Sequence, residues 1–283
     1  MIDTKILMDK ILLIGDTIID INTEGTLLGT STETPTLVIS KDTEISTQGG
    51  AALVHRNLTK LGCNYEFITN NYPYNLNNKA TTKQRYWCNR HKLLQVDDID
   101  NTPINDEESK QIFKYIQQSN TNVLAIADYR HGLLSPKLIE LINTSNKRII
   151  LDSQVSKSPA NHHMYKHIYL TLLNEHEAKQ YVPNITWDNV NEWKNELYKV
   201  IDSINFIVKF GRLGCIHISP TDATYVRGNP VNDPVDESGA GDAFMAALLA
   251  WMQKGHSSEI AAGWANEWAR RSVMVKGANP PND

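Results

Sequence analysis

Short apolar runs recur along the chain and alternate with longer stretches that have helical periodicity. The run Ile11–Ile14 has no polar residue, which is typical of a strand buried on both faces of a parallel sheet. Strands are predicted at Ile11–Ile14, Glu66–Thr69, Val123–Ala127, Arg148–Leu151, Ile168–Leu172, Phe206–Lys209, Cys215–Ile218 and Ala223–Val226. Helices are predicted at Ala51–Leu61, Glu107–Gln118, Pro136–Asn143, Glu175–Tyr181, Trp187–Val200, Ala240–Gln253 and Ser257–Val275. This alternation predicts an α/β fold with a doubly wound, mostly parallel sheet and helices on both faces.

Two early segments differ from this alternation. The segment Ile21–Lys41 is rich in Thr, Ile, Leu and Val, and Thr81–Val96 alternates polar and apolar residues. Both patterns indicate extended strands, so we expect a small second β-sheet. We expect it to form a lid, from about residues 21–48 and 80–97, inserted in a single domain of residues 1–283. Such a lid would exclude water from a reaction beneath it.

The composition narrows the function without identifying it. The 283 residues carry a net charge of -4, which argues against a nucleic-acid-binding surface. The three cysteines form no C-x-x-C pair, so we expect neither a disulfide framework nor a zinc site. No apolar run is long enough to span a membrane, and the apolar stretch before Lys10 is too interrupted for a signal peptide. We therefore expect a cytoplasmic protein that does not act at a membrane.

Gly239-Ala240-Gly241-Asp242 lies where a loop is predicted to become a helix. Free backbone N–H groups and the helix dipole favour anions there, and glycines let an anion approach closely. Gly239, Ala240 and Gly241 therefore predict a hole for a phosphoryl group, and Asp242 could accept a proton from an attacking hydroxyl. A tight turn followed by a capping acid would give the same pattern.

Other polar residues occupy positions where ligands bind in α/β sheets. Asp16 and Asp20 follow the first predicted strand, at whose carboxyl end ligands commonly lie, although Asp16 could be a turn residue. Lys83 and Arg85 alternate and so share one face of a strand, which suits a phosphorylated sugar or simply a solvated surface.

Asn174 and Glu177 are three apart at a predicted helix start, where they could hold a magnesium-bound water, form a capping box, or do both. Lys209 ends a strand, and its charge could serve nucleotide phosphates or be no more than a charge at a strand end.

Several motifs in order resemble the ribokinase-like, or PfkB, family of carbohydrate kinases. Besides Asp236-Glu237-Ser238-Gly239-Ala240-Gly241-Asp242, they are Gly49-Gly50-Ala51-Ala52, Asn174-Glu175-His176-Glu177 and Lys209-Phe210-Gly211-Arg212-Leu213-Gly214. The resemblance implies a ribokinase-like fold, ATP and Mg2+ as cofactors, Asp242 as base and Gly239–Gly241 as anion hole. It implies nucleotide contacts from Asn174, Lys209, Gly211, Gly214 and Asn266, and a magnesium role for Glu177.

Within that family the chain is most similar to the D-glycero-D-manno-heptose-7-phosphate kinases of ADP-heptose synthesis for lipopolysaccharide. The similarity rests on Gly15-Asp16-Thr17-Ile18-Ile19-Asp20, Thr32–Val38, Thr81–Arg85, Asn89–Asp97 and Asp128-Tyr129-Arg130-His131-Gly132. It implies phosphorylation of the anomeric hydroxyl of a heptose 7-phosphate to the 1,7-bisphosphate. The sugar contacts it implies are Asp16, Asp20, Gly49, Gly50, Lys83, Arg85 and Asp128. In relatives such lids often pair between subunits, so a homodimer through the lid is expected as well.

Some residues depart from the pattern of this branch. Leu53 stands where the branch has Asn, Glu237 where it has Thr, Gln154 where it has the Lys of Asp-Pro-Lys, and His131 where it has Lys. The segment between Asn70 and Ala80 is also shorter than in relatives, which predicts a trimmed sheet edge. Two alternatives therefore remain open: a kinase of the same family for a hexose or pentose, and a catalytically weak relative that binds ligands.

Overall fold

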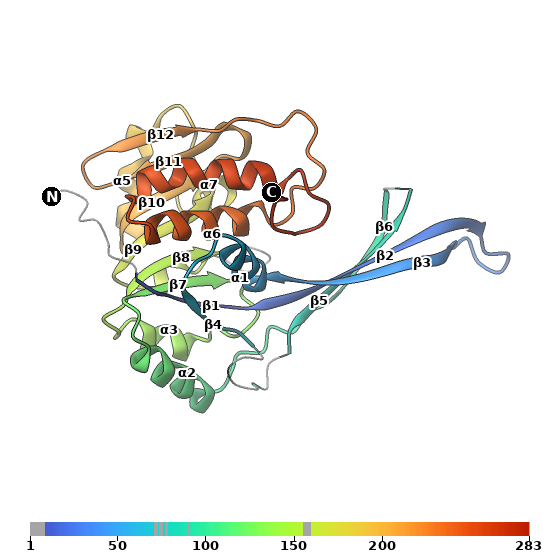
Figure 1. Ribbon diagram of the computed structural model, residues 1–283, viewed down its shortest axis with the longest axis horizontal. Coiled ribbons are helices and arrows are strands. Elements are labelled where there is room, and N and C mark those ends of the chain that lie inside the picture. The colour runs from blue at the N-terminus through green and yellow to red at the C-terminus, as the bar shows by residue number, and fades with distance from the viewer. Residues whose placement is uncertain are drawn as a thin grey trace.

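The computed structural model describes residues 9–70, 73, 76, 79–89, 91–154 and 160–282. Residues 1–8, most of the loop predicted from Asn70 to Asn78, and Arg90 lie outside the described residues. Figure 1 shows a layered main body and a long, narrow second sheet that extends away from it. No helix among the described residues is long and apolar enough to cross a membrane.

The main body is built on an eight-stranded sheet in the order β12-β11-β10-β9-β8-β7-β1-β4. The six strands β4, β1, β7, β8, β9 and β10 are parallel to one another. At one edge β11 pairs antiparallel with β10, and β12 pairs antiparallel with β11. Their bounds are β1 Ile11–Gly15, β4 Tyr65–Ile68, β7 Val123–Asp128, β8 Arg148–Ser153, β9 Ile168–Asn174, β10 Ser203–Lys209, β11 Gly214–Ile218 and β12 Ala223–Arg227. The predicted mostly parallel sheet is therefore confirmed.

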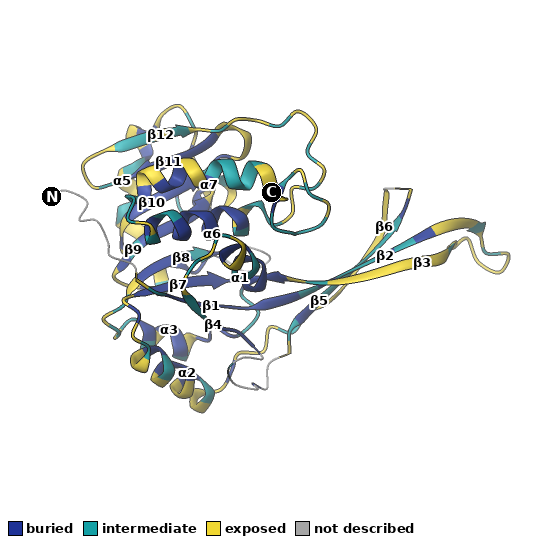
Figure 2. Ribbon diagram, in the orientation of Figure 1, coloured by how far each residue is buried: buried dark blue, intermediate teal, exposed yellow. Residues whose placement is uncertain are grey.

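Helices cover both faces of this sheet, as Figures 1 and 2 show, and each face has its own buried cluster. One cluster includes side chains of α2 Asp106–Gln118, α3 Pro136–Ile142, α4 Glu175–Lys179 and α5 Val190–Val200. The other includes side chains of α1 Ala51–Lys60, α6 Ala240–Gln253 and α7 Ser258–Ser272. Short 3-10 turns lie at His162–Met164 and Gly211–Leu213. All five residues of β1 are buried because packed helices lie on both sides of the strand.

The second sheet has the order β3-β2-β5-β6. Its strands are β2 Thr17–Thr30, β3 Leu37–Gly50, β5 Thr81–Cys88 and β6 His91–Asp98. Outside its base this sheet is largely exposed, which Figure 2 shows along β3 and β6. The sheet begins at Thr17 rather than near residue 21, because β2 continues almost directly from β1. From the sequence, Asp20 was expected at the end of the first strand. In the structure Asp20 lies within β2 of the second sheet.

Candidate active site

The loop before α6 forms a backbone cradle at the helix N-terminus. Gly239 precedes the helix with φ 79° and ψ 4°, a left-handed conformation that favours glycine. A Cβ atom at Gly239 would lie 2.3 Å from Cδ2 of Leu53 and 3.1 Å from Cβ of Ala278, so any larger residue would displace its neighbours. The N–H groups of Ala240 and Gly241 start the helix and have no partner four residues back within it. Ala240 N–H makes a long hydrogen bond of 3.4 Å to the Glu237 carbonyl. This geometry suits an anion.

Asp242 lies in the first turn of α6 and is half-buried. Loss of hydration and the nearby charge of Asp20 raise its pKa to about 8, although Arg56 and Lys83 oppose the shift. The hydroxyl of Tyr129, which follows β7, donates a hydrogen bond to Oδ1 of Asp242. A carboxylate whose pKa lies near neutrality is a suitable general base.

Asp20 contributes a second carboxylate on the side of the lid-like sheet. Its Oδ1 accepts a hydrogen bond from Nη1 of Arg85 at 2.7 Å, and this contact is also an ion pair. Its Oδ2 would lie 2.3 Å from a Cβ at residue 49, which explains the need for Gly49. Lys83 is directly opposite Asp20 in the register of β2 and β5, so it shares the face that carries Asp20 and Arg85. The predicted alternation of Lys83 and Arg85 on one strand is present.

Asp16 and Asp128 lie beneath the site rather than facing it. Asp16 is fully buried, and its carboxylate accepts hydrogen bonds from the backbone N–H groups of Tyr129, His131 and Leu133. Burial, and next the charge of Asp128, raise the pKa of Asp16 to about 7.

Asp128 is also buried and accepts hydrogen bonds from Arg130 N–H, Ser153, Asn161 and Tyr165. Protein donors thus hold both carboxylates in place, and the sugar contacts expected of Asp16 and Asp128 stay predictions.

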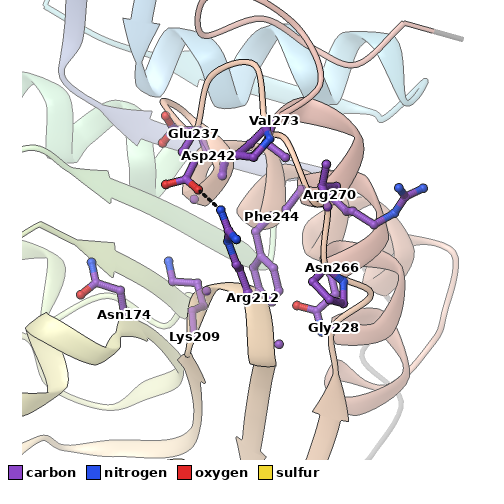
Figure 3. Close-up of a pocket in the computed structure, with 18 of the residues that line it drawn as sticks. Asn174, Lys209, Arg212, Gly228, Glu237, Asp242, Phe244, Asn266, Arg270 and Val273 are labelled. Atoms are coloured by element: carbon purple, nitrogen blue, oxygen red, sulfur yellow. Dashed lines mark ion pairs between the residues drawn. The ribbon is translucent and has the colours of Figure 1, made fainter.

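A cavity of about 680 Å³ adjoins the start of α6, and Ala240, Gly241 and Asp242 line part of its wall. Figure 3 shows side chains from the β-strand ends and from α6 and α7 around it. Among its lining residues are the predicted nucleotide-site residues Asn174, Glu177, Lys209, Gly211, Gly214, Ala240, Gly241, Asp242 and Asn266. Gly211 and Gly214 both have positive φ angles, of 54° and 108°. The Asn266 side chain donates to the carbonyl of Val226 at 3.0 Å, which joins α7 to β12 at the cavity wall.

Lys209 carries a buried positive charge into this cavity. Its Nζ lies 2.8 Å from Oδ2 of Asp152 and 3.8 Å from the position a Cβ would take at Gly241. Burial disfavours the lysine charge, but Asp152 and Glu177 outweigh that effect and keep the pKa of Lys209 above its usual value. Asp152 on β8 thus has the ammonium group of Lys209, at the end of β10, beside it.

Asn174 and Glu177 form a capping box at the start of α4. The Asn174 side chain accepts from Glu177 N–H at 2.8 Å, and Glu177 Oε2 accepts from Asn174 N–H at 2.7 Å. The capping interpretation is therefore confirmed. Within the described residues, no group of three or more His, Cys, Asp or Glu side chains is arranged for a metal. The single buried carboxylate of Glu177 does suit Mg2+, which retains waters and uses few protein ligands.

The residue that departs from the expected Thr has a partner in the structure. The carboxylate of Glu237 forms an ion pair with Arg212 at 3.7 Å, and Figure 3 shows this contact at the cavity. Both side chains are more than half exposed, so the pair is weak in water. Arg212 thus places a positive charge next to the extra carboxylate that Glu237 brings near the start of α6.

Two contributors escaped the sequence reasoning: Tyr129 and Arg56. Tyr129 follows directly after Asp128 at the carboxyl end of a buried strand, and that position could have identified it. Arg56 lies in the middle of α1, and two of its hydrogen-bond partners, Ala278 and Asn279, are more than 220 residues away in the chain. No local pattern marks such a residue.

Comparison with known proteins agrees with this arrangement. A family model described as pfkB family carbohydrate kinase matches residues 135–283, more than half of the chain. The bifunctional protein HldE of Aliarcobacter butzleri is 25% identical over 283 residues, which cover 91% of this chain and 59% of that protein. HldE of Acidiphilium cryptum is 25% identical over 290 residues and is covered to 58%. The chain thus spans about three-fifths of the length of these relatives.

Solved structures show the same fold at lower sequence identity. Arabidopsis thaliana ribokinase complexed with ribose and ATP aligns with a TM-score of 0.71 at 16% identity, over 97% of this chain and 96% of that chain. Escherichia coli phosphofructokinase-2 in complex with potassium aligns with a TM-score of 0.72 at 15% identity, over 97% and 95% of the two chains. The ribokinase-like α/β fold predicted from the sequence is therefore confirmed.

Proposed function

The chain belongs to the pfkB family of carbohydrate kinases and is therefore a sugar kinase, and we propose that it uses ATP to phosphorylate the anomeric hydroxyl of a heptose 7-phosphate. The observation that carries the proposal is the position of Asp242. It lies at the anion-binding start of α6, between the cavity that contains Lys209 and the sheet face that carries Asp20. Donor phosphates and an acceptor hydroxyl would meet there.

In this proposal ATP occupies the cavity and its γ-phosphoryl group lies at the cradle of Gly239, Ala240 and Gly241. Their N–H groups stabilise negative charge on the transferred group, and Lys209 adds a positive charge from the opposite side. Asp242 orients the acceptor hydroxyl and takes its proton as the hydroxyl oxygen bonds to the γ-phosphorus. The bond from that phosphorus to the bridging oxygen breaks in the same step, and ADP leaves with the electron pair. The Tyr129 hydroxyl stabilises the ionised form of Asp242.

Mg2+ fits the same cavity. Glu177 and Asn174 would hold it through water, and bound Mg2+ would neutralise charge on the ATP phosphates. Glu177 is held in place by its hydrogen bond to the Asn174 backbone, so the carboxylate is fixed before ligands arrive.

Acceptor binding is assigned to the face shared by Asp20, Lys83 and Arg85. Asp20 would accept hydrogen bonds from sugar hydroxyls beside Gly49 and Gly50, where the backbone comes close. Lys83 and Arg85 would attract the phosphate that a heptose 7-phosphate already carries. We assign Asp16 and Asp128 positioning roles, since they hold the loop containing Tyr129 through Leu133 by its backbone.

An ADP-release assay over a panel of sugars and sugar phosphates tests the proposal. Turnover with a heptose 7-phosphate, well above that with pentoses, hexoses and their phosphates, is expected. Absence of turnover with every heptose phosphate would refute the substrate assignment.

Two observations favour a different acceptor within the same family. Arg85 is already ion-paired with Asp20, and Leu53 packs against Gly239 without offering a polar atom. Both features suit an unphosphorylated hexose or pentose better than a sugar phosphate. Preference for such a sugar in the same panel would establish this alternative.

The Glu237 carboxylate motivates the last candidate, a weakly active relative that binds ligands. Its charge lies beside the cradle and would oppose an incoming phosphate unless Arg212 neutralises it. Nucleotide binding without measurable transfer to any acceptor would support this candidate.

We also propose that residues 1–283 act as one kinase domain in which the second sheet is a lid, and that two copies pair through it. Large apolar side chains are exposed on its strands β2, β3 and β6, namely Leu27, Leu28, Leu37, Val38, Ile45, Leu93, Leu94 and Val96. Exposed apolar surface of this extent commonly marks an interface.

A further inference from the structure

Arg56 connects α1 and the adjoining end of β3 to residues 278–279, which are more than 220 residues away in sequence. It lies on α1, and its guanidinium Nη2 donates to the carbonyl of Gln48 at 2.8 Å, near the end of β3. The same nitrogen donates to the carbonyl of Ala278 at 2.7 Å, and Nη1 donates to Oδ1 of Asn279 at 2.8 Å. Two of these contacts span more than 220 residues. The planar guanidinium thus fixes the base of the second sheet against the segment that follows α7.

That segment, residues 276–279, also contacts the phosphate cradle and the second sheet. Gly277 N–H donates to Oδ2 of Asp236 at 3.2 Å, at the start of the loop that leads into α6. Ala278 lies against Gly239 itself. Lys276 forms an ion pair with Glu24, which is on β2. Figure 1 shows the C-terminal end near α6 and α1, on the side from which the second sheet extends. Residues 276–279 therefore brace the cradle against the sheet.

The charge of Arg56 reaches both carboxylates of the proposed reaction. It interacts electrostatically with Asp20 and with Asp242, and it favours the ionised form of Asp242. Arg56 is half-buried, and its Nε is a buried nitrogen with no hydrogen-bond partner among the described residues. Burial lowers the pKa of Arg56 from its usual value, and the two carboxylates oppose that shift. A guanidinium is held in such a place only where neighbouring groups compensate its loss of hydration.

We propose that Arg56 is a positioning residue that couples the second sheet to the phosphate cradle: it holds β3 and residues 276–279 together so that Asp20, Asp242 and Gly239 take up their working positions at once. The proposal rests on the proposed function, since it takes Asp242 as the base. When Arg56 makes its hydrogen bonds to Gln48, Ala278 and Asn279, it holds Ala278 in place against Gly239 of the cradle. When they are broken, the loop before α6 loses this support and Asp242 loses a favourable charge.

Three variants separate the two effects of Arg56. Arg56→Met removes both the charge and the hydrogen bonds, Arg56→Lys keeps a charge but not the forked contacts, and Asn279→Ala removes one contact and keeps the charge. Arg148→Met is the matched control, because Arg148 is exposed at the start of β8, opposite the strand ends that carry the site. Circular dichroism and thermal unfolding establish that each variant is folded.

The decisive readout does not depend on turnover. Asp242 is titrated by carbon NMR of its carboxyl group, with Asp242→Asn used to assign the signal. For Arg56→Met the midpoint should move up by about one pH unit, since a neighbouring opposite charge lowers a carboxyl pKa by roughly that much or more. For Asn279→Ala and Arg148→Met it should stay within a few tenths of a unit of wild type. If Arg56→Met does not fold, Arg56→Lys and Asn279→Ala carry the test through the exchange measurement below.

Backbone hydrogen exchange tests the brace. Arg56→Met, Arg56→Lys and Asn279→Ala should each speed exchange at residues 276–279 and in the loop 236–241, and Arg148→Met should not. An unchanged Asp242 midpoint in Arg56→Met, or unchanged exchange at 276–279 in every Arg56 variant, overturns the proposal. In the acceptor panel, kcat should fall by about 100-fold in Arg56→Met and by about tenfold or less in Asn279→Ala. If the panel finds no acceptor, the substrate assignment fails while titration and exchange still decide the role of Arg56.

Discussion

The hydroxyl of Tyr129 donates a hydrogen bond to Oδ1 of Asp242, and this contact joins the loop after β7 to the first turn of α6. Tyr129→Phe should therefore weaken the ionised form of Asp242. A hydrogen bond to a charged group contributes about 1.5–3 kcal/mol, so kcat/KM at pH 7 should fall by about 10- to 100-fold. Steady-state kinetics measure this. Tyr198→Phe is the control, because that hydroxyl donates to the Ile204 carbonyl at an exposed position. Equal effects of both substitutions would contradict the assignment.

The proton affinity of Asp242 predicts the pH dependence. Burial and the charge of Asp20 raise its pKa to about 8, and a base must be deprotonated to act. In the wild type, kcat/KM should rise about tenfold per pH unit below pH 8 and level off above it. Asp242→Asn should remove most turnover and leave ATP affinity, measured by calorimetry, within a few-fold of wild type. A flat profile between pH 6 and 9, or near-normal turnover of Asp242→Asn, would show that another group is the base.

Lys209 and Asp152 form an ion pair inside the cavity, and their separation is 2.8 Å. Lys209→Met would leave Asp152 without that cation and make the cavity more negative, so the KM for ATP should rise by at least about tenfold, or ~1.4 kcal/mol. Adding Asp152→Asn should recover part of the loss, because the uncompensated carboxylate is then removed. Lys199→Met, which breaks an exposed ion pair with Glu196, is the control. A normal KM for ATP in Lys209→Met would exclude Lys209 from phosphate binding.

Lys83 distinguishes the two kinds of acceptor. It lies opposite Asp20 across β2 and β5, on the face proposed to bind the sugar. If the acceptor carries a phosphate, Lys83→Met should raise the KM for the phosphorylated sugar by about tenfold, since a charged contact is lost. The KM for the corresponding unphosphorylated sugar should change less than about twofold. Lys92→Met, at an exposed position on β6, controls for a general loss of charge. A parallel change for both sugars would favour the hexose or pentose alternative.

The proposed pairing of two copies through the second sheet predicts that a substitution on that sheet converts the dimer to a monomer. Ile45 is 61% exposed on β3, and Ile204 is 53% exposed on β10 of the main body. If two copies associate through the second sheet, Ile45→Glu should shift the species seen in sedimentation velocity from dimer to monomer. Ile204→Glu should leave the distribution unchanged. A wild-type protein that sediments as a monomer at micromolar concentration would end the proposal.

The sequence predicted the main sheet because each buried strand carries its own pattern. Ile11–Ile14 and Val123–Ala127 are apolar throughout, which is typical of strands covered by helices on both faces. The start of α6 was also predicted, at Ala240 after Gly239, and the anion-binding role of this helix start stays a prediction. The α5 helix begins at Val190 rather than Trp187, a boundary that side-chain pattern determines poorly.

The sequence could not separate Asp16 from Asp20. Both follow the first strand, and only the three-dimensional arrangement places the backbone N–H groups of Tyr129, His131 and Leu133 around Asp16. The contacts of Arg56 and Glu237 could not be predicted for a related reason. Their partners, Ala278 and Asn279 for one and Arg212 for the other, are brought near by tertiary folding and have no fixed spacing in the chain.

β3 continues directly into α1, so the second sheet could rotate as a rigid unit about their junction at Gly50. Gly50 joins the two with φ 63° and ψ -140°, and the Asp16 carbonyl next to it accepts from Ala51 N–H, so the fulcrum lies beside Asp20 and Gly49. The distal end near Thr30 is ten residues from Asp20, or about 33 Å away at the rise of a strand. Gly50 pairs with Thr17, which is thirteen residues from Thr30. A rotation of about 10° at Gly50 would therefore move that end by roughly 7.5 Å and Asp20 by roughly 1.7 Å. A partner that bound the far end of the sheet and displaced it by several ångströms would thus shift Asp20 slightly, and so alter the acceptor site without contacting the sugar.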